Sequence, residues 1–176
     1  DEYSSWEKET GYTYIMANYD RWEQKAPMIE GLTPEERQMV SDNIQENFVK
    51  LVNQYPNTTF HIFYTPYSIC WWDFMNQEGM MQMQFDAEEI ATKLLLQCPN
   101  VRLYNFNDQY EVITDLNNYR DKEHYSAKIN SKILEWIAAG EGLVTKENYQ
   151  KRLETEKQYF LNYDYESVFE QAAKGE

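Results

Sequence analysis

Apolar residues recur at spacings of three and four along the segment between residues 33 and 56. The stripe consists of Val40, Ile44, Phe48, Leu51, Val52 and Tyr55. Thr33-Pro34-Glu35-Glu36 opens the segment with a capping hydroxyl, a proline at the first helical position and a glutamate that can reach back to the cap. The pattern predicts an amphipathic helix that packs on a sheet and ends at Pro56.

Two other segments are apolar without a helical period. Residues 58–64 are β-branched and aromatic and lie between Pro56 and Pro66, which is typical of a strand covered on both faces. We therefore interpret 58–64 as a central parallel strand, and residues 101–106 as another strand.

Further helices are predicted from capping and periodicity. Asp86 and Glu89 form a second capping-box pattern, followed by a compact apolar face. Apolar residues spaced along 129–137 predict a helix that stops near Gly140, and Thr145 opens a final, charged helix.

The order helix, strand, helix, strand is typical of a doubly wound sheet with right-handed crossovers. We therefore predict an α/β fold of three layers, with a mostly parallel sheet flanked by helices. The expected organisation is an irregular lead-in over 1–32, an α/β core over 33–140 and a C-terminal helical extension over 141–176.

Composition limits the classes of partner. With 176 residues, 42% of them hydrophobic and 16% aromatic, the chain should be one packed globule. Its net charge of -14 argues against a nucleic-acid backbone or an anionic membrane surface, because both would repel it. No apolar run approaches the roughly 20 residues that span a bilayer, and the first residues lack the pattern of a signal peptide. We expect a soluble chain without a membrane span or a nucleic-acid partner.

The cysteines and the spacing of possible metal ligands do not indicate a metal or cofactor site. Cys70 and Cys98 are compatible with one disulfide or with two buried thiols. The sequence has no zinc or EF-hand spacing and no glycine-rich phosphate loop. We therefore predict no metal and no cofactor.

The better catalytic candidate of the two histidines is His124, in Asp121-Lys122-Glu123-His124. A serine-type hydrolase needs an imidazole to take the proton of the nucleophile and a carboxylate to hold the useful tautomer. This short segment can supply both. The alternative is that Asp121 caps the following helix and His124 is an ordinary polar residue in its first turn.

An aromatic segment between the two strands is the candidate binding surface. Trp71 and Trp72, with Tyr67 and Phe74, can form a platform on which a sugar ring stacks. The alternative is that at least one tryptophan belongs to the core. Ser68 lies at a sheet edge where ligands bind and is a candidate nucleophile or binding residue, although such a serine more commonly satisfies a turn.

The stretch DLNNYRDKEHYSAKINSKILEWI resembles the Asp-x-x-His block that SGNH/GDSL hydrolases place after their last core strand, followed by their C-terminal helix. The segment ending in Tyr64-Thr65-Pro66-Tyr67-Ser68 is similar to the penultimate core strand of that superfamily. The two matches cover residues 33–140. The resemblance implies a flavodoxin-like fold, with Asp121 as the orienting acid and His124 as the general base.

The chain also departs from that superfamily. The Gly-Asp-Ser type turn that carries the nucleophile, the oxyanion glycine and the Gly-x-Asn-Asp block do not occur. The first helix begins at Thr33, which leaves no room for the strands that carry those blocks. We therefore expect the C-terminal part of a longer protein, with a fold incomplete at its N-terminus and a nucleophile outside this chain. A sheet edge exposed in this way would favour self-association.

The resemblance implies an esterase or O-acyltransferase domain that acts on an acylated carbohydrate or cell-envelope polymer, in an extracytoplasmic or envelope-associated setting. The alternative is a non-catalytic module that binds carbohydrate or protein. A Gly-Asp-Ser type segment upstream in the longer protein would favour the enzyme, and its absence would favour the module.

Overall fold

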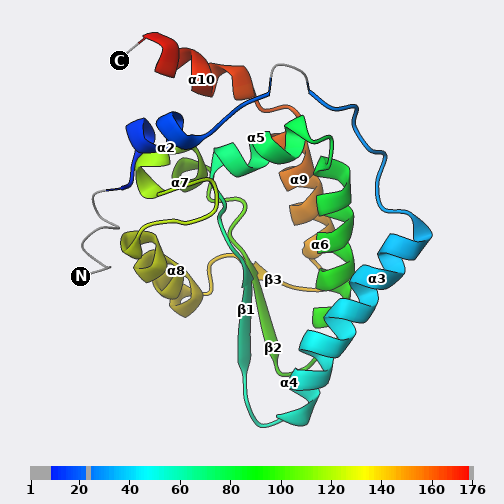
Figure 1. Cartoon of the computed structure of the whole chain (residues 1–176). Coiled ribbons are helices and arrows are strands. Elements are labelled where there is room, and N and C mark those ends of the chain that lie inside the picture. The colour runs from blue at the N-terminus through cyan, green and yellow to red at the C-terminus, as the bar shows by residue number, and fades with distance from the viewer. Residues whose placement is uncertain (1–8, 23–24, 175–176) are drawn as a thin grey trace.

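The computed structural model describes residues 9–22 and 25–174 of the chain (Figure 1). Its elements follow in the order α2 (Tyr12–Asn18), α3 (Pro34–Ile44), a π-helical turn (Gln45–Val49), α4 (Lys50–Gln54), β1 (Phe60–Tyr64), α5 (Ile69–Gln77), α6 (Met81–Leu95), β2 (Val101–Asn105), α7 (Tyr110–Thr114), a 3-10 turn (Leu116–Asn118), α8 (Ala127–Ala139), β3 (Leu143–Val144), α9 (Tyr149–Leu161) and α10 (Tyr165–Lys174).

The sheet of the described residues is small and mixed, in the order β1-β2-β3. β1 and β2 pair in parallel, from Phe60 opposite Val101 to Tyr64 opposite Asn105. β3 runs antiparallel to β2, with Val144 opposite Leu103. β1 is therefore an edge strand, because no other strand in the described ranges pairs with its second side.

The predicted three-layer fold with a mostly parallel, flavodoxin-like sheet is wrong. The structure is 57% helical, and its sheet has three strands, one of them antiparallel. The parallel unit β1-α5-α6-β2 does form, but after β2 the chain continues as helices and the two-residue strand β3. The assignment of residues 58–64 to a central strand is also wrong, because His61 and Phe63 on one face of β1 are exposed.

Of the two capping boxes predicted from the sequence, one forms and the other does not. The helix start at Thr33 is confirmed, because the Thr33 hydroxyl accepts from the Glu36 N–H and the Glu36 carboxylate accepts from the Thr33 N–H. The second capping box is wrong, because α6 begins at Met81 and Asp86 lies buried within it. The Asp86 carboxylate instead binds the Arg37 guanidinium, which joins α6 to α3.

The largest hydrophobic core lies between α5, α6 and α9 (Figure 1). Trp72 is fully buried there, stacked on Phe160 with ring centroids 3.7 Å apart and on Phe85 at 5.8 Å. Ile15 of α2 and Tyr165 of α10 belong to the same core, so segments from both ends of the described chain share it.

Helices cover both faces of the sheet around β2. Ile129 and Ile133 of α8 pack against Tyr104 and Phe106 on one face, and Leu95 of α6 packs against the other face. The carboxyl ends of the two parallel strands point toward α5 and α7 (Figure 1). The loops that leave these ends hold the candidate site.

Candidate functional site

The Asp121 carboxylate and the His124 imidazole form a hydrogen-bonded pair. His124 Nδ1 lies 2.8 Å from Asp121 Oδ2 and 2.9 Å from Oδ1. Asp121 Oδ1 also accepts from the backbone N–H groups of Glu123 and His124, each at 2.8 Å. Because an ionised carboxylate only accepts, Nδ1 carries the hydrogen and Nε2 is the proton-accepting nitrogen.

The charge of Asp121 is stabilised by this arrangement. Burial on its own raises the pKa of Asp121, but the backbone N–H groups of Glu123 and His124 and the imidazole together hold the pKa below its usual value. The acid therefore stays ionised and can stabilise an imidazolium on His124. The alternative, in which Asp121 caps α8, is wrong because the N-cap of α8 is Ser126.

A tight loop presents this pair. Tyr119 and Tyr125 form an antiparallel bridge, and the Arg120 N–H donates to the His124 carbonyl at 2.8 Å. The Tyr119 hydroxyl donates to the Pro66 carbonyl at 2.6 Å, which ties the loop to the segment that leaves β1. The Asp121–His124 pair thus lies at the carboxyl end of a parallel strand, where α/β sheets commonly place ligand sites.

A hollow of about 560 Å³ lies beside the pair. It is lined by Tyr14, Ile15, Asn18, Tyr19, Asp20, Trp22, Phe74 and the loop residues 120–124. The Lys122 ammonium lies 3.7 Å from the centre of the Phe74 ring, in a cation–π contact. The hollow therefore combines aromatic walls with an exposed acid–base pair, since the side chains of His124 and Asp121 are 58% and 48% exposed.

The predicted binding residues divide between surface and interior. Tyr67 and Trp71 are half-buried and stack with ring centroids 4.7 Å apart. Trp72 is buried between Phe85 and Phe160, so the prediction that it forms part of a sugar platform is wrong. Tyr67, Trp71 and the half-buried Phe74, which lines the hollow beside His124, remain candidates for ring stacking.

Ser68 is buried, and its hydroxyl and backbone N–H both form hydrogen bonds. Its Oγ donates to the Lys122 carbonyl at 2.8 Å, and its N–H donates to the same carbonyl at 3.2 Å. Ser68 thus anchors the loop that carries Asp121 and His124, and its prediction as a substrate-contacting residue or a nucleophile is wrong for this arrangement.

Neither cysteine offers an alternative nucleophile. Cys70 and Cys98 are both free and buried, which decides between the two states that the sequence left open. Burial raises the pKa of the Cys70 thiol to about 12 and also raises that of Cys98. A thiol that stays protonated at neutral pH is a poor nucleophile.

An ion pair that sequence reasoning missed supports one wall of the hollow. The Arg21 guanidinium binds the fully buried Asp73 carboxylate, with Nε 2.8 Å from Oδ2. The Tyr19 hydroxyl donates to the same oxygen at 3.1 Å. The one signal in the sequence was a lone acidic residue in the apolar run ICWWDFM, since a charge at a core position needs a partner.

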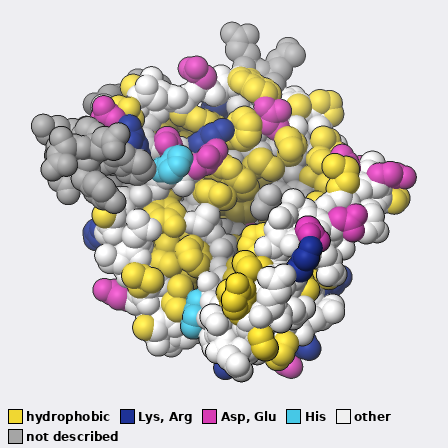
Figure 2. Space-filling view, turned by 60° about the horizontal axis from the view of Figure 1, so that its bottom comes forward, with side chains coloured by type: hydrophobic (Ala, Val, Ile, Leu, Met, Phe, Trp, Pro, Cys, Tyr) yellow, Lys and Arg dark blue, Asp and Glu magenta, His cyan; other side chains and the backbone are white. Residues whose placement is uncertain are grey.

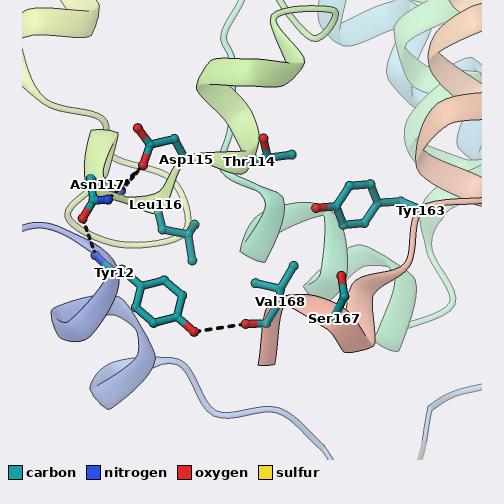
Figure 3. A pocket seen from close by; sticks show the side chains of 8 residues that line it. All are labelled: Tyr12, Thr114, Asp115, Leu116, Asn117, Tyr163, Ser167 and Val168. Atoms are coloured by element: carbon teal, nitrogen blue, oxygen red, sulfur yellow. Dashed lines mark hydrogen bonds between the residues drawn. The ribbon is translucent and has the colours of Figure 1, made fainter. Parts of the chain in front are cut away.

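A second hollow, of about 480 Å³, lies between α2, the Thr114–Asn117 segment and α10 (Figure 3). The Tyr12 hydroxyl donates to the Val168 carbonyl at 3.2 Å across it, and the Asn117 side chain accepts from the Tyr12 N–H. Figure 3 shows no imidazole or lysine among the side chains that line it. It therefore lacks the acid–base groups of the first hollow.

Within the described residues, no group of three or more histidine, cysteine, aspartate or glutamate side chains is placed to hold a metal ion. No described helix is both long and apolar enough to cross a membrane.

Comparisons with protein-family models, with curated proteins and with solved structures found no match.

Proposed function

We propose that this chain supplies the acid–base half of an esterase or O-acyltransferase site of the Ser-His-Asp type, with the nucleophilic hydroxyl coming from outside this chain. The observation that carries the proposal is the 2.8 Å contact between His124 Nδ1 and Asp121 Oδ2, with Asp121 held by two backbone N–H groups. The resemblance of the Asp-x-x-His block to that of SGNH/GDSL hydrolases supports the same assignment.

Each residue has one role in the proposed reaction. His124 Nε2 takes the proton of the attacking hydroxyl as the oxygen adds to the acyl carbonyl, and Asp121 stabilises the imidazolium that results. The imidazolium then returns the proton to the leaving alcohol as the ester bond breaks. Transfer of the acyl group to water gives hydrolysis, and transfer to another hydroxyl gives acyl transfer.

The free edge of β1 is where we place the source of the hydroxyl. A strand added in parallel to this edge would end beside the loop that carries Asp121 and His124, since that loop is anchored to the carboxyl end of β1 through Ser68 and Tyr119. In the chain on its own, we propose that the same edge takes a second copy.

The substrate that we propose is an acylated carbohydrate or cell-envelope polymer, in an extracytoplasmic or envelope-associated setting. The stacked pair of Tyr67 and Trp71 supports a ring-shaped, uncharged substrate, because aromatic faces provide contact area with fixed geometry. The net charge of -14 disfavours polyanions.

One observation favours a second candidate function, a carbohydrate-binding module without catalysis. Ser68, the serine whose Oγ touches the loop of the Asp121–His124 pair, is fully buried on the Lys122 carbonyl. The Ser68 hydroxyl is therefore held by a backbone carbonyl.

Hydrolysis of acetylated sugars by the natural protein that carries this chain tests the proposal. We expect His124→Ala and Asp121→Asn to lower kcat/KM by about 10²–10⁴-fold. The matched control is His61→Ala, which removes the other imidazole, bonded to the Tyr104 hydroxyl on the sheet, and should keep its activity.

Equal turnover by wild type and His124→Ala would contradict the enzymatic role. Saturable binding of acetylated sugars without turnover by any of the proteins would favour the binding module. Loss of binding on Trp71→Ala would then identify the aromatic pair as the contact surface.

A further inference from the structure

Two glutamates from different helices meet in the interior, away from the candidate site. Glu88 of α6 is 4% exposed and Glu156 of α9 is 2% exposed. Asn105 Nδ2 donates to Glu88 Oε1 at 2.7 Å and to Glu156 Oε2 at 2.9 Å. Asn107 Nδ2 donates to Glu156 Oε1 at 2.9 Å and to Glu88 Oε2 at 3.3 Å. Each carboxyl oxygen of the pair thus accepts one amide N–H.

The orientation of the Asn105 amide is fixed by the backbone. Asn105 Oδ1 accepts from the Asn107 N–H at 2.7 Å, so the NH₂ group of Asn105 must face the carboxyl groups. The Asn107 Nδ2 also donates to both glutamates. Asn105 therefore presents a donor to the pair and not the oxygen that a cation site would need.

The carboxyl groups of Glu88 and Glu156 lie side by side, because the amide nitrogens of Asn105 and Asn107 each donate to both of them. Two ionised carboxylates placed together in the interior would repel each other without a compensating charge. One proton shared between the two groups removes that repulsion.

The Arg152 guanidinium lines the same hollows as the two glutamates but is bonded to other groups. Arg152 Nη2 donates to the Asp108 carboxylate at 2.7 Å and to the Asn105 carbonyl at 3.1 Å. The other titratable groups around the pair are Tyr64 from β1, Asp108 and Tyr110 near α7, and Tyr149 and Lys151 from α9. Among the described residues, neither glutamate forms an ion pair with Arg152 or Lys151.

Both glutamates are shifted in the same direction. Burial and the charge of Glu156 raise the pKa of Glu88 well above its usual value. Burial raises the pKa of Glu156 to about 7, against the opposing effect of the hydrogen bonds from Asn105, Glu88 and Asn107. Protonation near neutral pH is thus consistent with the hydrogen-bond geometry.

We propose that Glu88 and Glu156 share a proton and form a clasp that makes the docking of α9 on α6 and β2 sensitive to pH. The clasp joins the two helices to the carboxyl end of β2 through Asn105 and Asn107. Its release would loosen the helix that supplies Phe160 to the stack on Trp72. This device operates whether or not Asp121 and His124 are catalytic.

The sign of the effect follows from the raised pKa values. In the neutral range the folded pair binds more protons than the unfolded chain, in which both glutamates titrate near their ordinary value. The stabilisation is fully present below that value and is lost as pH rises through the raised pKa values of the folded pair. The folded state should therefore weaken as the solution becomes alkaline.

The test is urea unfolding of wild type, Glu88→Gln and Glu156→Gln across about pH 5 to pH 9, where one released proton changes the unfolding equilibrium constant by up to tenfold per pH unit. Glutamine keeps the shape of a protonated glutamate and cannot ionise, so each variant should flatten the alkaline loss of stability. The matched control is Glu154→Gln on the exposed side of α9, which should keep the wild-type slope.

A second measurement holds even if a glutamine variant fails to fold. At a pH where exposed glutamates are ionised, native wild type should show the infrared band of a protonated carboxyl group, and unfolding should remove it. Absence of this band in the native protein would overturn the proposal. An alkaline slope in Glu88→Gln and Glu156→Gln equal to that of Glu154→Gln would also overturn it.

Discussion

Arg21 and Asp73 form a bidentate ion pair, with Nε 2.8 Å from Oδ2 and Nη2 3.1 Å from Oδ1. The Asp73 carboxylate is fully buried, and the outer edge of the guanidinium binds the exposed Glu166 carboxylate. The pair thus joins α5 to α10 and to the segment after α2. Because Tyr19 and Trp22 flank Arg21 in sequence and line the hollow beside His124, the same contact fixes one wall of the candidate site.

Arg21→Ala should destabilise the fold strongly. It leaves the Asp73 carboxylate in the core without its cation, and breaking one side of a buried pair costs about 3–5 kcal/mol. Lys93→Ala is the matched control, because it breaks the exposed pair with Glu89 on α6, which contributes roughly 0–1 kcal/mol. Urea unfolding measures both, and a similar small loss in the two variants would contradict the structural role of Arg21.

The adjacent tryptophans should respond differently to truncation. Trp72→Ala removes the ring stacked between Phe85 and Phe160 and should cost about 3–5 kcal/mol of unfolding free energy. Trp71→Ala removes a half-buried ring stacked on Tyr67 and should cost less, while it weakens the binding of acetylated sugars. Denaturant unfolding and fluorescence titration measure the two effects. A larger stability loss in Trp71→Ala would reverse our assignment.

The features that could be predicted from sequence are local ones. The capping box of Thr33 and Glu36 lies within one helical turn, so its residue types and spacing determine the contact. The same holds for Asp121 and His124, whose separation lets one loop bring their side chains together. The helix end at Gly140 was also predictable, because its φ of 74° favours glycine.

The features that were missed depend on contacts between distant segments. Asp86 has the local pattern of a helix cap, but it lies within α6 and its carboxylate forms an ion pair with Arg37 of α3. Glu88 and Glu156 lie on different helices, and neither carries a local signal that it meets the other. The size of the sheet was missed for a related reason. The number of strands depends on which segments pair, and the order of helices and strands in one parallel unit does not determine it.

Asp121→Asn should lower stability in a pH-dependent way. The folded pKa of Asp121 lies below its unfolded value, so its stabilisation is present above the unfolded pKa and is lost as pH falls through the folded pKa. For a carboxylate with a side chain 48% exposed, we expect a cost of about 0.5–1 kcal/mol at neutral pH. Thermal unfolding of both proteins at neutral and strongly acid pH measures it, and a cost that is equal at both pH values would contradict the ionised pair.

The free edge of β1 should drive self-association of the chain on its own. The strand FHIFY carries no acidic or basic side chain apart from a histidine, so copies with a net charge of -14 can approach there without direct repulsion. The Phe60 N–H and the Tyr64 carbonyl bond toward β2, which directs the backbone groups of His61 and Phe63 to the open side because a parallel ladder uses alternate residues. Figure 2 shows hydrophobic side chains gathered around a hollow on the face that holds both histidines.

Phe63→Lys tests this edge directly. Phe63 is 37% exposed, and a lysine there should hinder a second strand from docking, as charged side chains do on natural edge strands. The matched control is Leu134→Lys, which changes a side chain that is 68% exposed on α8. In sedimentation velocity, wild type and Leu134→Lys should shift to larger species as concentration rises, whereas Phe63→Lys should stay monomeric. A wild-type chain that remains monomeric throughout would show that the edge does not pair with itself.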